Sequence, residues 1–224
     1  MIYQHSATHY EWDGGNLDFN FIDYANDKKL KIIKPAHIKT SIKIESEVNY
    51  KPKKINTIQK ITDRIHRDKI IPIVNILNPI LGKYGRFDLC GSYRRGKETI
   101  KDMDYVIQTP QEKFRNLREE LQNIGIQFVR GANEIMNGIY IPNGIGIDFF
   151  RADPDSYITL LIWRTGSKNH NIYCAKVALR QGMKIKRSGI QLKNGEIFHP
   201  KTEQEFYDCL GMKFIPPNQR DMEF

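Results

Sequence analysis

GSYRRGKETIKDMDYVIQTP, residues 91–110, joins a glycine–serine turn with two arginines to a pair of aspartates and an apolar run. The turn follows a short apolar segment, which is typical of a strand running into a helix whose first backbone N–H groups face an anion. Gly91 lets the backbone come close, and Ser92 can donate its hydroxyl. Arg94 or Arg95 can fork onto phosphate oxygens. The turn predicts a phosphate site; the alternative is a capped surface helix with solvated arginines.

The same stretch places two carboxylates one residue apart. Because residues i and i+2 of a strand point the same way, Asp102 and Asp104 share one face and Met103 takes the other. Such close like charges repel unless cations share them, and hard oxygen ligands suit Mg²⁺. A third acid, Asp148, stands in the apolar run 144–152, where a carboxylate is costly to bury unless it is paired or bound to metal. Three aspartates on adjacent strands can hold two metals about 3.5–4 Å apart. For the D-x-D pair alone, the alternative is a polar strand end exposed to water.

The apolar pattern from about residue 56 onward predicts an α/β arrangement of helices and strands. Pro72 fits the first turn of a helix, whereas Pro79 should strain or end it. We expect helices over 67–85, 112–125, 153–166 (from an Asp-Pro cap), 171–183 and 202–211. We expect strands over 87–92, 104–110, 127–131, 134–141 and 144–152, a hairpin turn at 142–144, and short strands around Ile185, Ile190 and Ile197.

Composition bounds the class of protein. The longest apolar run, 70–77, is far too short to span a bilayer, and the N-terminus lacks the basic and apolar parts of a secretory signal. Cys90, Cys174 and Cys209 lie far apart with no CxxC pair, which argues against a disulfide framework or a zinc site. We therefore expect an intracellular protein without a membrane partner, with the nucleus and a cytoplasmic replication site left open.

The charge of the chain points to a polyanionic partner. The net charge is +9 and the pI about 9.3. Residues 1–27 hold five acids and no Lys or Arg, whereas residues 28–60 hold ten lysines and two glutamates, a net charge of +8. This run predicts either a nucleic-acid-binding arm or a solvated face. Residues 37–48 alternate apolar and polar side chains and suggest a strand, and 51–54 suggest a linker.

The motif GSYRRGKETIKDMD resembles the G-S-x-R-R-G…D-x-D signature of family X DNA polymerases. The similarity continues through DFFRADPDSYITLLIWRTGS and covers about residues 60–224. It implies an α+β nucleotidyltransferase palm with a mixed sheet and helices at 56–152, and a C-terminal α/β nucleotide- and template-binding lobe at 153–224. Residues 1–55 would be a short N-terminal extension that contains β-structure and contacts DNA.

The resemblance implies a template-directed DNA polymerase that adds dNTPs to a primer 3′-hydroxyl with two Mg²⁺ ions, or Mn²⁺ in their place. Short-gap filling in DNA repair would be its task, with gapped or primer–template DNA as partner and a monomer as the working form. Two alternatives stay open: a template-independent nucleotidyltransferase acting on DNA or RNA ends, and a catalytically inactive nucleic-acid-binding protein.

The resemblance also assigns residues. Asp102, Asp104 and Asp148 would be the catalytic metal ligands, with Asp148 nearest the primer hydroxyl. Gly166–Ser167 matches a position where the family carries a non-proline cis peptide. The nucleotide contacts would be Arg64, Gly91, Ser92, Arg95, Lys101, Trp163, Arg164, Gly166 and Asn171. Lys184, Lys186 and Arg187 would contact DNA near a strand where the family meets template, with a solvated edge strand as the alternative. The basic run, and not the resemblance, adds Lys28, Lys29, Lys31 and Lys34 as DNA contacts, with a solvated face as the alternative.

The chain departs from the family pattern in several places. Trp163-Arg164 replaces an aromatic pair or Gly-Trp, whose aromatic residue packs under the sugar. Arg164 could instead reach phosphate, stack on a base or lie on the surface. Ala175 stands where an arginine senses the template, and Gly146 stands where an arginine neighbours the third aspartate. Residues 1–60 show neither a helix-hairpin-helix element nor an assignable lyase lysine. Without these elements the chain resembles the minimal family members of large DNA viruses. The N-terminal extension would supply the DNA contacts that the helix-hairpin-helix elements make in other members.

Overall fold

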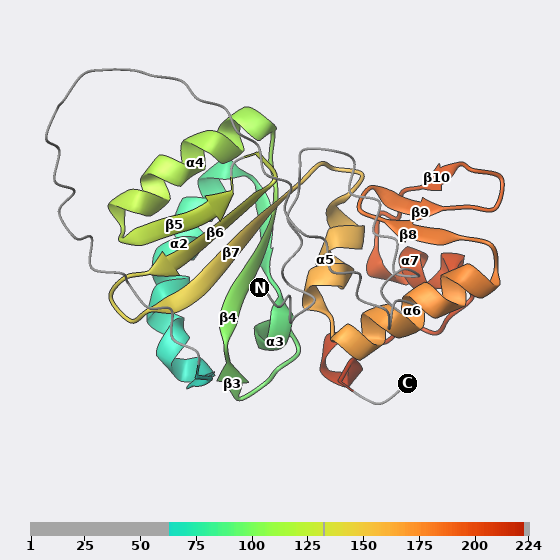
Figure 1. The fold of residues 1–224 in the computed structure, drawn as a ribbon, viewed down its shortest axis with the longest axis horizontal. Coiled ribbons are helices and arrows are strands. Elements are labelled where there is room, and N and C mark those ends of the chain that lie inside the picture. Colours follow the sequence, from blue (N-terminus) through green and yellow to red (C-terminus); the bar gives the residue numbers. More distant parts are fainter. Residues whose placement is uncertain (1–62, 132, 222–224) are drawn as a thin grey trace, which may run out of the picture.

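The structure is a computed structural model that describes residues 63–131 and 133–221. Figure 1 shows a larger group of elements around a five-stranded sheet and a smaller group around a three-stranded sheet. The expected strand at 37–48, the linker at 51–54 and the lysines at 28–34 lie outside the described residues. Within the described ranges, no helix is both long and apolar enough to cross a membrane.

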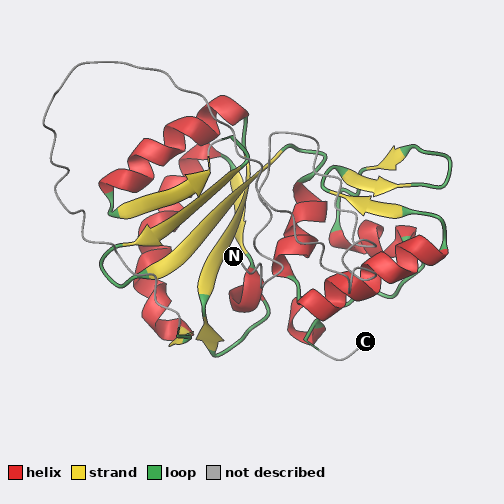
Figure 2. Cartoon of the chain, in the orientation of Figure 1, coloured by secondary structure: helices red, strands yellow, loops and turns green. Residues whose placement is uncertain are grey.

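The larger group carries the expected α+β order of elements (Figure 2). Its elements are β1 (Ile65–His66), the 3₁₀ helix η1 (Arg67–Ile70), α2 (Ile71–Tyr84), β2 (Arg86–Leu89), α3 (Gly91–Arg94), β3 (Thr99–Ile100), β4 (Asp102–Gln108), α4 (Gln111–Asn123), β5 (Ile126–Gly131), β6 (Ile135–Tyr140) and β7 (Ile145–Ala152). The smaller group contains α5 (Tyr157–Thr165), α6 (Lys168–Arg180), β8 (Lys184–Lys186), β9 (Gly189–Gln191), β10 (Ile197–Phe198), α7 (Glu203–Cys209) and the 3₁₀ helix η2 (Pro217–Gln219).

The central sheet is mixed, as expected. Its strand order is β2-β4-β7-β6-β5, in which β4 and β7 run parallel and every other neighbouring pair is antiparallel. Side chains of a strand alternate between the two faces, so β4 and β7 each present one set of residues to each side. This alternation separates the apolar core from the candidate site.

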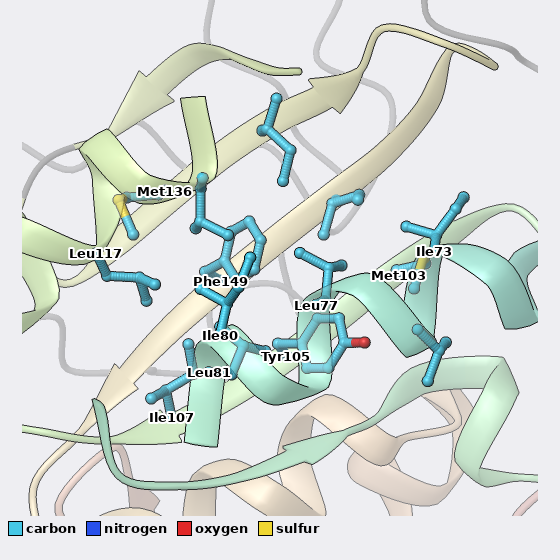
Figure 3. Close-up of a cluster of buried hydrophobic side chains, with 14 of the residues drawn as sticks. Ile73, Leu77, Ile80, Leu81, Met103, Tyr105, Ile107, Leu117, Met136 and Phe149 are labelled. Carbon is cyan, nitrogen blue, oxygen red and sulfur yellow. The ribbon is translucent and has the colours of Figure 1, made fainter. Parts of the chain in front are cut away.

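One face of the sheet packs under α2 and α4 (Figure 1). Met103, Tyr105 and Phe149 point to this face and meet Leu77 and Leu117 of the two helices in one buried cluster (Figure 3). The rings of Tyr105 and Phe149 stack with centroids 5.8 Å apart. Each large apolar side chain buried in this way stabilises the fold by about 1.5–3 kcal/mol. The cluster fixes the two strands that bear the aspartates.

The opposite face of the same strands faces the smaller group of elements. Val106 and Phe150 turn to this side and join a second buried cluster with Leu160 and Ile162 of α5. The two strands therefore supply alternate residues to both cores. The three aspartates lie on this second face, toward the starts of the strands.

Four expectations about local structure were wrong. Helix α2 continues through Pro79, because Leu77, Ile80 and Leu81 are buried on the sheet and this packing outweighs the lost N–H. The α-helix expected from residue 67 begins only at Ile71, because residues 67–70 form the 3₁₀ helix η1 directly after β1, which pairs with β3. Helix α5 begins only at Tyr157, because the Asp153 N–H donates to Ser156 Oγ at 2.9 Å and closes a turn first. Helix α6 begins at Lys168 because Ser167 caps it.

A buried histidine in the smaller group gives the fold a pH dependence. His170 is fully buried, with Nε2 2.7 Å from Tyr207 Oη and Nδ1 3.2 Å from Asn171 Oδ1. Burial, helped by the charge of Arg220, lowers the pKa of His170 to about 4. The unfolded side chain has a pKa of about 6.5, so the unfolded state binds the proton first as the pH falls. The contribution of neutral His170 to the free energy of unfolding is fully present above about pH 6.5, and it is lost as the pH falls to about 4.

We expect this histidine to cost the wild type about 2 kcal/mol of unfolding free energy between pH 7.5 and pH 5. Urea titrations at both pH values, for the wild type and His170→Gln, measure the difference, since all other titrating groups are shared. The variant should show a shallower loss with pH. Equal pH slopes in the two proteins would contradict a neutral buried His170.

Candidate active site

The strand register brings two of the predicted carboxylates together. In the parallel pair of β4 and β7, Asp104 lies directly opposite Asp148, and Asp102 lies opposite Gly146 two residues earlier. All three aspartates therefore share the face that looks toward the smaller group, and each is half-buried. The alternation of side chains along a strand predicted that Asp102 and Asp104 share a face. The register of β7 against β4, which places Asp148 opposite Asp104, comes only from the structure.

The turn into α3 lies against Asp104. The Cys90 N–H donates to the Asp104 carbonyl oxygen at 2.7 Å, which joins the end of the β2 segment to β4. Gly91 follows with φ +59°, and a Cβ at this position would lie 2.6 Å from Asp104 Oδ2. Glycine is thus required twice here, by the backbone conformation and by the neighbouring carboxylate. The next residue, Ser92, is 9% exposed.

The donor set suits a hard divalent cation. Asp104 and Asp148 offer carboxylate oxygens from adjacent strands, and Asp102 adds another from the start of β4. The described part of the chain contains no group of three or more His, Cys, Asp or Glu side chains gathered to hold a metal. Mg²⁺ commonly takes only one or two carboxylates and completes its shell with water and substrate oxygens. The residues therefore fit a divalent ion shared by Asp104 and Asp148; a three-carboxylate site for two ions stays a prediction.

The two arginines of the turn are engaged with carboxylates of the C-terminal elements. Arg95 Nε donates to both carboxylate oxygens of Asp221, at 3.0 and 2.9 Å, and Lys97 Nζ lies 3.1 Å from the same side chain. Burial opposes the charge of Asp221, yet these two cations hold its pKa below the ordinary value. Arg94 pairs with Glu203 at 2.7 Å. A phosphate that binds Arg95 through Nε must displace the carboxylate of Asp221.

Arg164 lies on the face of the aspartates. Its guanidinium carbon is 3.7 Å from the ring centroid of Phe150, which follows Asp148 by two residues on β7. Its Nε is buried and has no hydrogen-bond partner among the described residues. Burial lowers the pKa of Arg164, and the negative charges of Asp104 and Asp148 act in the opposite direction. The alternative of a surface arginine does not describe this side chain, which stacks on the protein's own phenylalanine.

Two of the other predicted nucleotide contacts, Arg64 and Asn171, hydrogen-bond within the protein. Arg64 Nε donates to Thr99 Oγ1 at 2.9 Å, and Lys101 is exposed just before β4. Asn171 Nδ2 donates to the Trp163 carbonyl at 2.8 Å. The Gly166–Ser167 peptide bond is cis, as the resemblance implied.

The predicted DNA contacts of the C-terminal elements divide into two kinds. Lys184 and Lys186 lie two apart on β8, which forms one edge of the three-stranded sheet. Arg187 instead pairs with Glu134, at 2.5 Å. The two lysines therefore lie on the same side of an edge strand, whereas Arg187 would have to leave Glu134 to contact DNA.

Sequence reasoning missed several residues of the site. Asn137 of β6 lies opposite Asp148 in the antiparallel register, so its amide shares the face of the carboxylates. Asp221 pairs with Arg95 from 126 residues away. A single sequence gives no signal for either pairing, because both depend on how distant elements meet.

Comparisons with known proteins cover much of the described chain. The DNA polymerase beta thumb family matches residues 160–221. The chain is 33% identical to the DNA polymerase/3'-5' exonuclease PolX of Bacillus subtilis (strain 168) over 138 residues. This alignment covers 61% of this chain and 24% of that protein. The chain is also 24% identical to DNA polymerase lambda of Rattus norvegicus over 160 residues, and this alignment covers 59% of this chain and 28% of that protein. The aligned part spans about a quarter of the length of these curated relatives.

Proposed function

We propose, because this chain is a homologue of the family X DNA polymerases, that it adds dNTPs to a primer 3′-hydroxyl on templated DNA. Filling of short gaps in DNA repair is the proposed task, and a monomer inside the cell is the proposed working form. The observation that carries the proposal is the register of Asp104 with Asp148 beside the Gly91 turn. This register places two carboxylates next to a glycine turn whose backbone can approach a phosphate group closely, an arrangement that suits nucleotidyl transfer.

Each group of the site would have a distinct task in the transfer. The primer 3′-oxygen loses its proton and attacks the α-phosphorus, and pyrophosphate leaves. Asp148, by the resemblance, would lie nearest the primer hydroxyl, with Asp102 and Asp104 completing the ligand set. Divalent ions, when bound, would activate the hydroxyl and offset the charge on the leaving pyrophosphate. Ser92 and Arg95 would orient the triphosphate, so that catalysis rests on positioning and charge.

One assay separates this function from its alternatives. A labelled primer is placed at a templated one-nucleotide gap with Mg²⁺ or Mn²⁺ and each dNTP in turn, and the same primer is offered without template. Correct addition at the gap alone supports the polymerase. Equal addition of all nucleotides, with or without template, supports the template-independent transferase, which Ala175 in place of a template-sensing side chain favours. Binding without addition supports an inactive nucleic-acid-binding protein.

DNA would be held mainly by lysines. Lys184 and Lys186 on the edge strand β8 and the lysines at 28, 29, 31 and 34 are the proposed phosphate contacts, since phosphate contacts supply most of the affinity for DNA. The likeness to the minimal viral members also belongs to this proposal. It rests on the motifs and on the absence of helix-hairpin-helix and lyase signals in residues 1–60.

Arg95→Ala is expected to weaken binding of the incoming triphosphate by about 10- to 100-fold and to affect DNA binding much less. A charge-assisted hydrogen bond to phosphate contributes about 1.5–3 kcal/mol, and Asp221 offsets part of this because the phosphate must displace it. Apparent dNTP affinity from single-turnover kinetics measures the effect. Arg115→Ala, on the exposed side of α4 away from the aspartates, is the matched control. An unchanged dNTP affinity would remove Arg95 from the site.

A further inference from the structure

We propose that Arg164 is the resident counter-charge of the aspartates, held over them before metal binds and released when a divalent ion takes its place. The inference rests on the proposed function only in taking Asp104 and Asp148 as the metal-binding carboxylates. Arg164 would set the affinity of the metal-free site for a divalent ion. Arg164 directly follows Trp163, at a position where the resemblance led us to expect an aromatic residue.

Geometry places the guanidinium over the aspartate face. Asp148 and Phe150 point to the same side of β7, and Arg164 stacks on the Phe150 ring at 3.7 Å. Asp104 pairs with Asp148 across the strands, and Val106 pairs with Phe150, so the ring and the carboxylates form one continuous strip. A guanidinium on this ring therefore lies at the edge of the carboxylate pair.

One nitrogen of this side chain is buried without a hydrogen bond within the described part of the chain. Its Nε is buried and unpartnered among the described residues, and burial disfavours its charge. Two favourable terms oppose this: the face of Phe150 and the negative charges of Asp104 and Asp148. The second term is the one that a metal removes, because a divalent ion neutralises the carboxylates.

Metal binding and the position of Arg164 are then linked. An ion that neutralises the pair takes away one of the two attractions that keep the guanidinium over Phe150. The positive charge of Arg187, which also acts on Arg164, further favours its departure. By reciprocity, a guanidinium in place weakens metal binding by the same factor. The empty site should accordingly bind metal more weakly than its carboxylates alone would allow.

Direct measurement of Mn²⁺ binding tests this without DNA or nucleotide. Electron paramagnetic resonance counts free Mn²⁺ in titrations of the wild type, Arg164→Gln and Arg164→Lys. We expect Arg164→Gln to bind Mn²⁺ on the order of tenfold more tightly. Arg164→Lys should fall between the two, since it keeps the charge but loses the planar stack. Arg115→Gln, which removes one charge from the other side of the sheet, should bind as the wild type does.

Two further measurements make the result decisive. Asp104→Asn combined with Arg164→Gln should abolish the gain, which assigns the bound Mn²⁺ to the aspartates. In the wild type, the Nε–H signal of Arg164, assigned with Arg164→Lys, should exchange slowly with solvent and become fast on saturation with Mg²⁺. This second readout applies even if Arg164→Gln does not fold. Unchanged or weaker Mn²⁺ binding in folded Arg164→Gln, or an Nε–H signal indifferent to Mg²⁺, would overturn the proposal, whatever the polymerase assay gives.

Discussion

Asp104→Asn should lower nucleotide incorporation on the order of 1,000-fold or more and leave DNA affinity unchanged or slightly raised. The carboxylate lies opposite Asp148 in the parallel strand pair and against the Gly91 turn, so its charge is central to the proposed site. DNA affinity depends chiefly on lysine and arginine contacts to phosphate, and the loss of one negative charge does not weaken those. Asn keeps the shape of the side chain, so a folding defect is not expected.

Single-turnover incorporation at a one-nucleotide gap measures the effect, with fluorescence anisotropy for DNA binding. Asp148→Asn should behave in the same way. Asp208→Asn, on α7 and hydrogen-bonded to Gln204, removes the same charge away from the site and should keep full activity. Near-normal turnover in Asp104→Asn or Asp148→Asn would exclude these residues as the metal ligands.

Gly91→Ala should lower incorporation on the order of 100-fold, more than its loss of stability explains. Two effects combine at this position. A side chain at φ +59° costs about 1–3 kcal/mol, and the new Cβ would lie 2.6 Å from Asp104 Oδ2. The carboxylate or the turn must shift, and a displacement of about 1 Å at a reacting centre can cost about 100-fold in rate.

Gly96→Ala separates the two effects. Gly96 has φ +77°, but a Cβ there would meet nothing within 4 Å. It therefore carries a similar backbone penalty without contact to the aspartate. Unfolding free energies should fall in both variants, and further in Gly91→Ala, whereas incorporation at a temperature where both are folded should fall only in Gly91→Ala. Equal activities would mean that the turn does not position Asp104.

Local patterns in the sequence predicted what depends on neighbours in the chain. The alternation of strand side chains placed Asp102 and Asp104 on one face, and the apolar spacing located most helices and strands. Pro79 was misread because burial of α2 on the sheet, a property of the whole fold, outweighs the local penalty.

The parts of the site that could not be predicted all depend on distant pairings. The register of Asp104 with Asp148, the ion pair of Arg95 with Asp221, and the stacking of Arg164 on Phe150 join elements far apart in the sequence. Arg164 was left with three readings because a single sequence does not show which side of the helix meets the sheet. Only the packing of α5 on β4 settles its neighbours.

The alternating strands have a consequence for dissecting the protein. Residues 160–221, which match the thumb family, form a unit of sequence, yet their apolar cluster also contains Cys90, Val106 and Phe150 from the other side of the boundary. A fragment cut before α5 would expose that cluster to water and leave the sheet bare on the aspartate face. The limit of the family match is therefore not a limit of independent folding, and the two excised fragments should fold only when they are mixed.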